Sequence, residues 1–287
     1  MGNLTDQIRN KFKSANIVEQ FVYINIAVFV LTYLVNSISF LMKFEGNFVF
    51  DWFSLPANFE NIMSRPWTIL TYGFLHEGIW HILFNLIILY YIGNLFLDFF
   101  SKRDFLFYYF LGMFFGGLIF ILSYNFFPAL KSERAFLVGA SAAVTSILIG
   151  IATKIPNYAL HFKFIGAIKL WYIAVAIVLL DIVQIPISNA GGHLAHLGGA
   201  LTGFLLTSLV TKNNSLSLFF SNLFKAKKQK PLKTVYKKRK PSKTVKNSNS
   251  HQRKIDDILD KISKSGYETL SKEEKEFLFS MGNKKDQ

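Results

Sequence analysis

The sequence contains no cysteine among its 287 residues. This absence excludes disulfide bonds, a thiolate nucleophile and a metal site built on cysteine, and it leaves the redox compartment open. Charged residues are also scarce, at 17% of the chain, whereas hydrophobic residues make up 51% and the mean hydropathy is +0.30. This balance is too apolar for an ordinary soluble protein of this length. We therefore expect a polytopic membrane protein.

Six segments are apolar over the roughly 20 residues that are needed to cross about 30 Å of hydrocarbon. They cover about residues 18–42, 78–100, 104–126, 137–153, 164–185 and 191–211. The first lacks a small-residue cleavage site and is too long for the apolar core of a signal peptide, so we interpret it as an anchor. The sequence therefore predicts an N-terminal segment, residues 1–16, followed by an all-α membrane domain of six helices, residues 17–211.

Basic residues are concentrated in the C-terminal part of the chain. Residues 212–287 hold 20 of the 32 lysines and arginines but only 8 of the 18 acidic residues, so most of the net charge of +14 lies there. A basic tail beside a membrane span favours a cytoplasmic location and contact with anionic lipid over binding of nucleic acid. We expect both termini in the cytoplasm, with the six helices in a bacterial cytoplasmic membrane.

The tail itself divides in two by its pattern. Residues 212–250 are basic and lack apolar periodicity, which predicts a disordered linker. Within residues 251–287, Ile255, Ile258 and Ile262 recur at helical spacing, and Ser271 and Glu274 form a capping-box pattern before a second apolar stretch. These signals predict a small helical hairpin. The hairpin could dock on a partner or on the membrane surface, or it could be a solvated appendage without an essential function.

Two polar residues stand among small residues within the predicted spans: Ser141 in Gly139-Ala140-Ser141-Ala142-Ala143, and His196 in Ala195-His196-Leu197-Gly198-Gly199. A serine hydroxyl needs a base within hydrogen-bond reach to act as a nucleophile, and an imidazole can be that base. His196, Gly199 and Gly203 share one helix face, where small residues let two helices approach closely. Each residue alone also fits plain helix packing, but the pair favours a Ser141 nucleophile with His196 as its base.

His81 and Asn85 are four residues apart and therefore share one face of the second predicted span. Their side chains, with the backbone N–H of Ser141, are candidate donors to the oxyanion that forms during acyl transfer. The alternative is a buried hydrogen-bonded pair that holds this span to its neighbours, and the two interpretations are compatible.

The remaining histidines raise the question of a metal. His76 and His81 are five residues apart, unlike the i, i+4 pair of an H-E-x-x-H zinc site. His193 and His196 could ligate together, but Asp181 is the one acidic candidate at that depth of the neighbouring spans. We expect neither a metal nor another cofactor, and we interpret His76 and His193 as hydrogen-bonded structural residues.

Four motifs together resemble the rhomboid family of intramembrane serine proteases: Arg65-Pro66-Trp67, His81-Ile-Leu-Phe-Asn85, Gly139-Ala-Ser141, and Ala195-His196-Leu-Gly-Gly199-Ala-Leu-Thr-Gly203. The resemblance covers about residues 17–211. It implies a compact six-helix bundle, a Ser141–His196 dyad without an acidic third member, an oxyanion site at His81, Asn85 and the Ser141 amide, and transmembrane proteins as substrates. It also implies a membrane-embedded first loop and substrate entry beside the fifth span.

Two residues depart from the family pattern. Ala142 stands where glycine usually follows the serine, and Thr145 stands where some members place an aromatic ring. Neither change removes a catalytic group.

The competing interpretation is a catalytically silent rhomboid-like protein that binds transmembrane helices, although such a protein would usually lack the serine or the histidine. A transporter would be expected to show repeat symmetry and broken helices, and the sequence shows neither. A lipase-type hydrolase would need the second glycine of a G-x-S-x-G turn, where this sequence has Ala143.

Overall fold

The computed structural model describes residues 3–131, 134–163, 165–212 and 248–282. The chain divides into two units, Met1–Phe224 and Lys225–Gln287. Most of the predicted basic linker falls on residues 213–247, which lie outside the described part of the chain.

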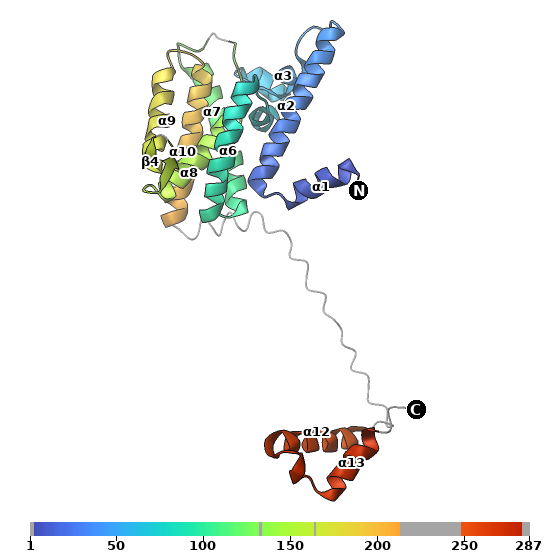
Figure 1. Ribbon diagram of the computed structural model, residues 1–287. Helices are drawn as coiled ribbons and strands as arrows, with labels where there is room; N and C mark the ends of the chain where they lie inside the picture. Colours follow the sequence, from blue (N-terminus) through green and yellow to red (C-terminus); the bar gives the residue numbers. More distant parts are fainter. Residues whose placement is uncertain (1–2, 132–133, 164, 213–247, 283–287) are drawn as a thin grey trace. The chain divides into compact units, whose positions relative to one another are not determined.

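The first unit is mainly helical, and its long helices run side by side in Figure 1. In chain order its elements are α1 (Leu4–Ser14), α2 (Ile17–Leu41), α3 (Phe48–Phe53), β1 (Leu55–Pro56), α4 (Phe59–Ser64), α5 (Thr68–Thr71), η1 (Tyr72–Phe74), α6 (Ile79–Phe99), α7 (Lys102–Phe126), β2 (Phe136–Leu137), α8 (Ser141–Lys154), β3 (Ala159–Phe162), β4 (Gly166–Lys169), α9 (Leu170–Gln184) and α10 (Ala190–Lys212). Among the described residues, α2, α6 and α7 are long and apolar enough to cross a membrane, while α8 and α9 are apolar but shorter. A total of six spans remains a prediction.

Two of the long helices begin at capping boxes. At α2 the side chain of Asn16 accepts the N–H of Glu19, whose carboxylate accepts the N–H of Asn16. Ser101 and Asp104 form the same reciprocal pair at the start of α7. Such pairs satisfy two backbone donors that a helix leaves unpaired at its first turn. The helix boundaries at these ends therefore follow from local sequence.

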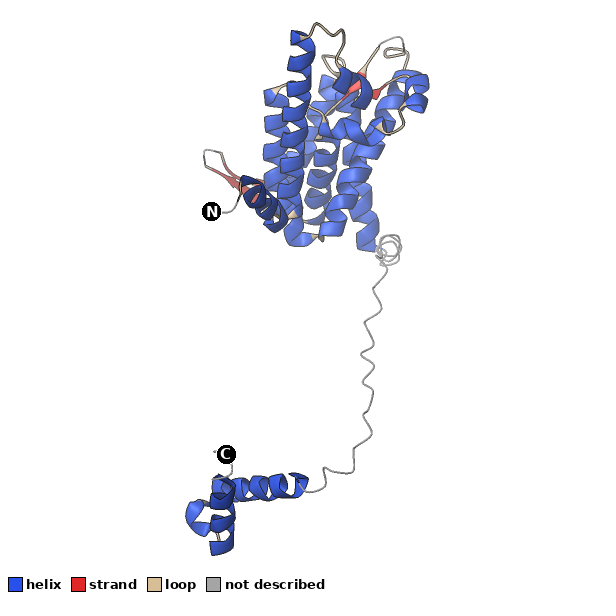
Figure 2. Cartoon of the chain, turned by 90° about the vertical axis from the view of Figure 1, so that its right-hand side faces the viewer, coloured by secondary structure: helices blue, strands red, loops and turns tan. Residues whose placement is uncertain are grey.

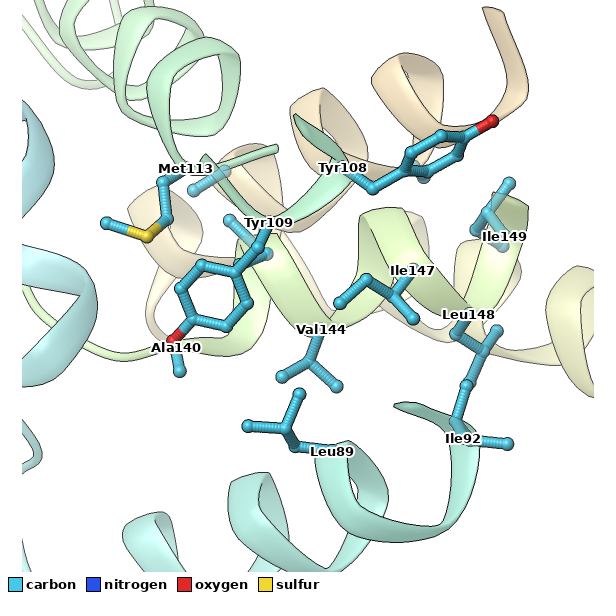
Figure 3. Packing of buried hydrophobic residues seen from close by; sticks show 14 of the residues in the cluster. Leu89, Ile92, Tyr108, Tyr109, Met113, Ala140, Val144, Ile147, Leu148 and Ile149 are labelled. Atoms are coloured by element: carbon cyan, nitrogen blue, oxygen red, sulfur yellow. The ribbon is translucent and has the colours of Figure 1, made fainter. Parts of the chain in front are cut away.

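Helix α8 lies at the centre of the first unit. Every residue from Ala142 to Ala152 is buried, and the helix packs against α6, α7 and α10. Figure 3 shows Val144 and Leu148 facing Leu89 and Ile92 of α6, with the tyrosines of α7 on the other side. Because α8 is enclosed on all these sides, the position of its first residue is set by the whole bundle.

The structure corrects two predicted spans and the expectation of a purely helical domain. The fourth helix begins at Ser141 rather than at 137, because Phe136–Leu137 pairs with Leu55–Pro56 as an antiparallel strand. The fifth begins at Leu170 rather than at 164, because Ala159–Phe162 and Gly166–Lys169 pair as the antiparallel strands β3 and β4. Apolarity alone does not distinguish a short strand from the start of a helix. The two strand pairs lie at opposite ends of the bundle in Figure 2.

The second unit contains α12 (Ser248–Ser265), the short turn η2 (Tyr267–Thr269) and α13 (Lys272–Gly282). Gly266, at φ +83°, follows the last residue of α12. The side chains of Ser271 and Glu274 exchange hydrogen bonds with each other's backbone N–H at the start of α13. Lys261 of α12 pairs with Glu274 at 2.9 Å, and Ile258 and Leu270 are buried. These elements form a helical hairpin.

Candidate active site

Ser141 is the first residue of α8, directly after a tight turn. Within that turn the N–H of Gly139 donates to the carbonyl of Tyr72 at 3.0 Å, and Gly139 has φ +118°. A Cβ at Gly139 would be strained at that φ and would lie 2.7 Å from Nε2 of His81. Glycine is therefore required here for two reasons, and the turn places Ser141 close to His81.

The structure brings Ser141 and His196 together, although 55 residues separate them. Oγ of Ser141 lies 2.7 Å from Nε2 of His196, which is within normal hydrogen-bond distance. The His196 side chain is 24% exposed, so the pair is shielded but accessible. This is the geometry of a nucleophile and its base.

Two glycines of α10 allow this approach. A Cβ on Gly199 would overlap the backbone carbonyl of Ala142, and a Cβ on Gly203 would overlap that of Ser146. The backbones of α10 and α8 therefore touch at two points four residues apart, as the small-residue spacing predicts. His196 precedes Gly199 by three residues and lies over the start of α8.

An acidic residue also reaches the histidine, a contact that the sequence did not predict. Oδ1 of Asp181, in α9, lies 2.8 Å from Nδ1 of His196 and 2.7 Å from Nδ1 of His193. The sequence named Asp181 only as a candidate metal ligand. The sequence feature that indicates such a contact is the single carboxylate in the otherwise apolar helix α9, because a charge there is costly without a partner.

His81 and Asn85 are placed differently with respect to the serine. Nδ1 of His81 accepts the backbone N–H of Glu77 at 3.3 Å, so the ring proton belongs on Nε2, the atom that faces Gly139. Asn85 is buried and donates one Nδ2 hydrogen to the carbonyl of His81 at 2.9 Å, which leaves its second amide hydrogen. His81 therefore presents a donor beside Ser141, whereas the hydrogen bond of Asn85 is to its own helix.

His76 lies beside this group without belonging to the serine contact. It is buried between η1 and α6, and its ring meets that of His81 edge to face at 5.1 Å. Burial, with a smaller effect of the neighbouring His81, lowers the pKa of His76 to about 4. The ring is therefore neutral near pH 7 and packs as an uncharged neighbour of His81.

Asp181, His193 and His196 are the one cluster of potential metal ligands found in the part of the chain that the structure describes. Ligand atoms of Asp181, His193 and His196 all lie within 4.8 Å of one another. Both histidines, however, direct Nδ1 at the same carboxylate oxygen at 2.7 to 2.8 Å, which is a hydrogen-bonding arrangement. The absence of a metal stays a prediction.

The methyl group of Ala142 points toward α7 and does not occupy the space beside Ser141 where the oxyanion would form. A Cβ built on Gly116 of α7 would lie 2.7 Å from the Ala142 Cβ, so the methyl packs against that glycine. Thr145 is buried, with 8% of its surface exposed. Both departures from the family pattern are accommodated within the packed helices.

Comparisons with known proteins match the chain to described families. The Rhomboid domain family matches residues 63–213, and a family of unknown function (DUF6576) matches residues 242–281. RHOMBOID-like protein 4 of Arabidopsis thaliana is 30% identical over 217 residues, which cover 65% of this chain and 50% of that protein. RHOMBOID-like protein 12, mitochondrial, of the same plant is 26% identical over 181 residues, or 59% of this chain and 53% of that protein.

The chain spans about half the length of these curated relatives. The Rhomboid match alone covers more than half of this chain and includes all of the residues that meet around Ser141. With three long apolar helices among the residues that the structure describes, the chain is a membrane protein. It belongs to the rhomboid family.

Proposed function

We propose that this protein is an intramembrane serine endopeptidase in which Ser141 is the nucleophile and His196 is the general base. The observation that carries the proposal is the 2.7 Å contact between Oγ of Ser141 and Nε2 of His196, made by two polar side chains within apolar helices. Polar residues in such surroundings are costly and mark functional sites. Membership of the rhomboid family supports the same reaction.

The chemistry follows from these two groups. Nε2 of His196 takes the hydroxyl proton as Oγ of Ser141 attacks the peptide carbonyl, and the imidazolium then gives that proton to the departing amine. The peptide C–N bond breaks and an ester forms on Ser141. Water, deprotonated by the same imidazole, hydrolyses the ester and restores the serine.

The start of α8 suits the stabilisation of the oxyanion. Ser141 is the first helical residue, so its backbone N–H has no acceptor within the helix and lies at the positive end of the helix dipole. Nε2–H of His81 is the second donor and the free amide hydrogen of Asn85 is the third. A site with several donors stabilises the charge that develops on the carbonyl oxygen.

The proposed substrates are transmembrane proteins, cleaved within or near an apolar helix. The proposal includes six spans, with both termini in the cytoplasm, and no cofactor. We further propose that the basic residues after α10 contact anionic lipid, because clustered lysine and arginine beside a membrane span are attracted to such surfaces.

The second candidate function is that of a silent rhomboid-like protein that binds transmembrane helices. The only specific support for it is that rhomboid-like proteins are the relatives found. A silent protein has no need for a serine and an imidazole at hydrogen-bond distance. We therefore favour the protease.

The test is labelling and cleavage by the purified, detergent-solubilised full chain. A fluorophosphonate probe is expected to label Ser141, and a transmembrane substrate with a destabilised helix is expected to be cleaved. Ser141→Ala should abolish both, and His196→Ala should abolish cleavage, because neither group has a substitute.

Matched controls separate chemistry from folding. Ser123→Ala removes another serine of the bundle, whose hydroxyl donates to the carbonyl of Ile119, and His161→Gln changes an exposed histidine of β3. Both controls should cleave as the wild type does, and all variants should unfold at similar temperatures. Cleavage by a folded Ser141→Ala variant, or no labelling of the wild type, would contradict the proposal.

A further inference from the structure

We propose that Asp181 is a positioning residue that fixes the tautomer of His196, and that His193 holds the Asp181 carboxylate in place. This inference rests on the proposed function, because it assigns Asp181 a role toward the base of that site. The site would then be a Ser141–His196–Asp181 triad whose acidic member comes from α9.

The contacts are short and enclosed. Oδ1 of Asp181 lies 2.8 Å from Nδ1 of His196, and Nε2 of the same ring lies 2.7 Å from Oγ of Ser141. The Asp181 side chain is 8% exposed. The three groups therefore form a continuous chain of hydrogen bonds from the carboxylate to the hydroxyl.

The surroundings of Asp181 make a purely incidental position costly. Helix α9 has fifteen residues, and only Leu170 and Asp181 among them are buried. A carboxylate in an apolar helix is expensive unless it is paired and turned into the bundle. Here its hydrogen bonds run to the two histidines of α10 and to no lysine or arginine of the described chain.

The direction of these hydrogen bonds determines the tautomer. A carboxylate only accepts, so Nδ1 of His196 carries the proton and Nε2 is left with the lone pair that the Ser141 hydroxyl needs. When Nε2 takes the serine proton, the adjacent negative charge stabilises the imidazolium. His193 donates to the same oxygen from one turn earlier and limits the rotation of the carboxylate.

Isosteric variants test the charge apart from the shape. Asp181→Asn keeps the size of the side chain and removes its charge, so kcat should fall on the order of 10²–10⁴-fold. KM should stay within about twofold, because the change affects the reacting groups and not substrate binding. Asp181→Glu restores a carboxylate and should recover part of the loss, while Ile182→Val is the control on the same helix.

Substitution of His193 provides a second kinetic test. His193→Ala should lower kcat about tenfold, as expected for the loss of one hydrogen bond to a charged group. In the Asp181→Asn background it should add little, because its effect passes through the carboxylate. Equal additional losses in both backgrounds would overturn the role given to His193.

A spectroscopic measurement makes the tautomer assignment independent of activity. In protein labelled with ¹⁵N-histidine, the resonances of His196 are assigned by their loss in His196→Gln, and the neutral ring should carry its proton on Nδ1. A proton on Nε2 would overturn the inference even in an active protein. An inactive wild type with the Nδ1 proton would contradict the proposed function instead.

The kcat values of the Asp181 variants decide whether Asp181 acts on the chemistry. Unchanged kcat in a well-folded Asp181→Asn variant overturns the role of Asp181 while leaving the Ser141–His196 protease intact. Equal losses in Asp181→Asn and Asp181→Glu, together with lower unfolding temperatures, would show a structural role and also overturn it. A selective fall in kcat with partial recovery by glutamate supports it.

Discussion

Helices α8 and α9 both contribute to the site, but they are held in opposite ways. In α8 every residue from Ala142 to Ala152 is buried, whereas in α9 only Leu170 and Asp181 are. Within a membrane, apolar side chains gain little by leaving lipid, so helices are held by close packing of small residues and by hydrogen bonds between helices. Helix α8 relies on the first of these, whereas α9 packs on the core with partly buried side chains such as Ile173 and Val178 and adds the hydrogen bonds of Asp181.

The difference assigns separate tasks to the two helices. The place of Ser141 is fixed by the backbone of α8, which touches α10 at Gly199 and Gly203 and so tolerates almost no displacement. The orientation of His196 depends on a side chain of α9 that makes two hydrogen bonds. Disturbing the first contact should therefore damage both fold and chemistry, and disturbing the second should damage chemistry alone.

The largest effect is expected from Gly199→Val. The added side chain would overlap the Ala142 carbonyl and push α10 away from α8. A misplacement of about 1 Å can cost on the order of 10² in rate, and a valine here would shift the backbone at the level of the base. Cleavage and fluorophosphonate labelling should both be lost, and the unfolding temperature should fall.

Gly198→Ala is the matched control, because Gly198 faces α7 and not α8. A Cβ there would lie 3.0 Å from Gly116 Cα and from the Phe115 carbonyl, which requires only a small adjustment. We expect reduced stability with labelling retained. Normal labelling in a folded Gly199→Val variant would show that the α8–α10 contact does not set the serine–histidine distance.

The sequence was sufficient to predict this contact, because its determinants are local and periodic. Gly199 and Gly203 lie one helical turn apart, and His196 shares their face, so the spacing alone brings the base toward another small-residue helix. The capping residues Asn16 and Ser101, which were not among the predicted features, also determine helix starts by local contacts. Such features do not depend on how the rest of the chain folds.

A more limited effect is expected from His81→Ala, which should slow the reaction without displacing a helix or lowering the unfolding temperature. Its Nε2–H faces Gly139 beside the serine, and losing one donor of an oxyanion site typically costs on the order of 10²–10³ in rate. Asn85→Ala should cost less, because the Asn85 amide also serves the His81 carbonyl. The measurement is kcat for both variants, with thermal unfolding as the control, and an effect of Asn85→Ala larger than that of His81→Ala would reverse the assignment.

The features that the sequence did not predict depend on contacts between distant segments. The predicted start of α8 is too early because Phe136–Leu137 pairs with the distant strand Leu55–Pro56, and the predicted start of α9 is too early because Gly166–Lys169 pairs with Ala159–Phe162. The contact of Asp181 with His196 requires α9 to be turned so that its one carboxylate faces α10. A single acidic residue in an apolar helix indicates a function but does not identify its partner.

The smallest effect is expected on the outer surface of α9, and a pair of matched leucines measures it. Leu180 is 61% exposed although it adjoins Asp181, whereas Leu148 of α8 is 3% exposed within the core. In Leu180→Ala lipid replaces the lost side chain, so kcat and the unfolding temperature should stay close to the wild type. In Leu148→Ala a cavity remains inside the bundle, because neighbouring side chains relax only in part, and the unfolding temperature should fall. Equal destabilisation by the two changes would mean that the outer surface of α9 contributes to the stability of the bundle as much as the core around α8 does.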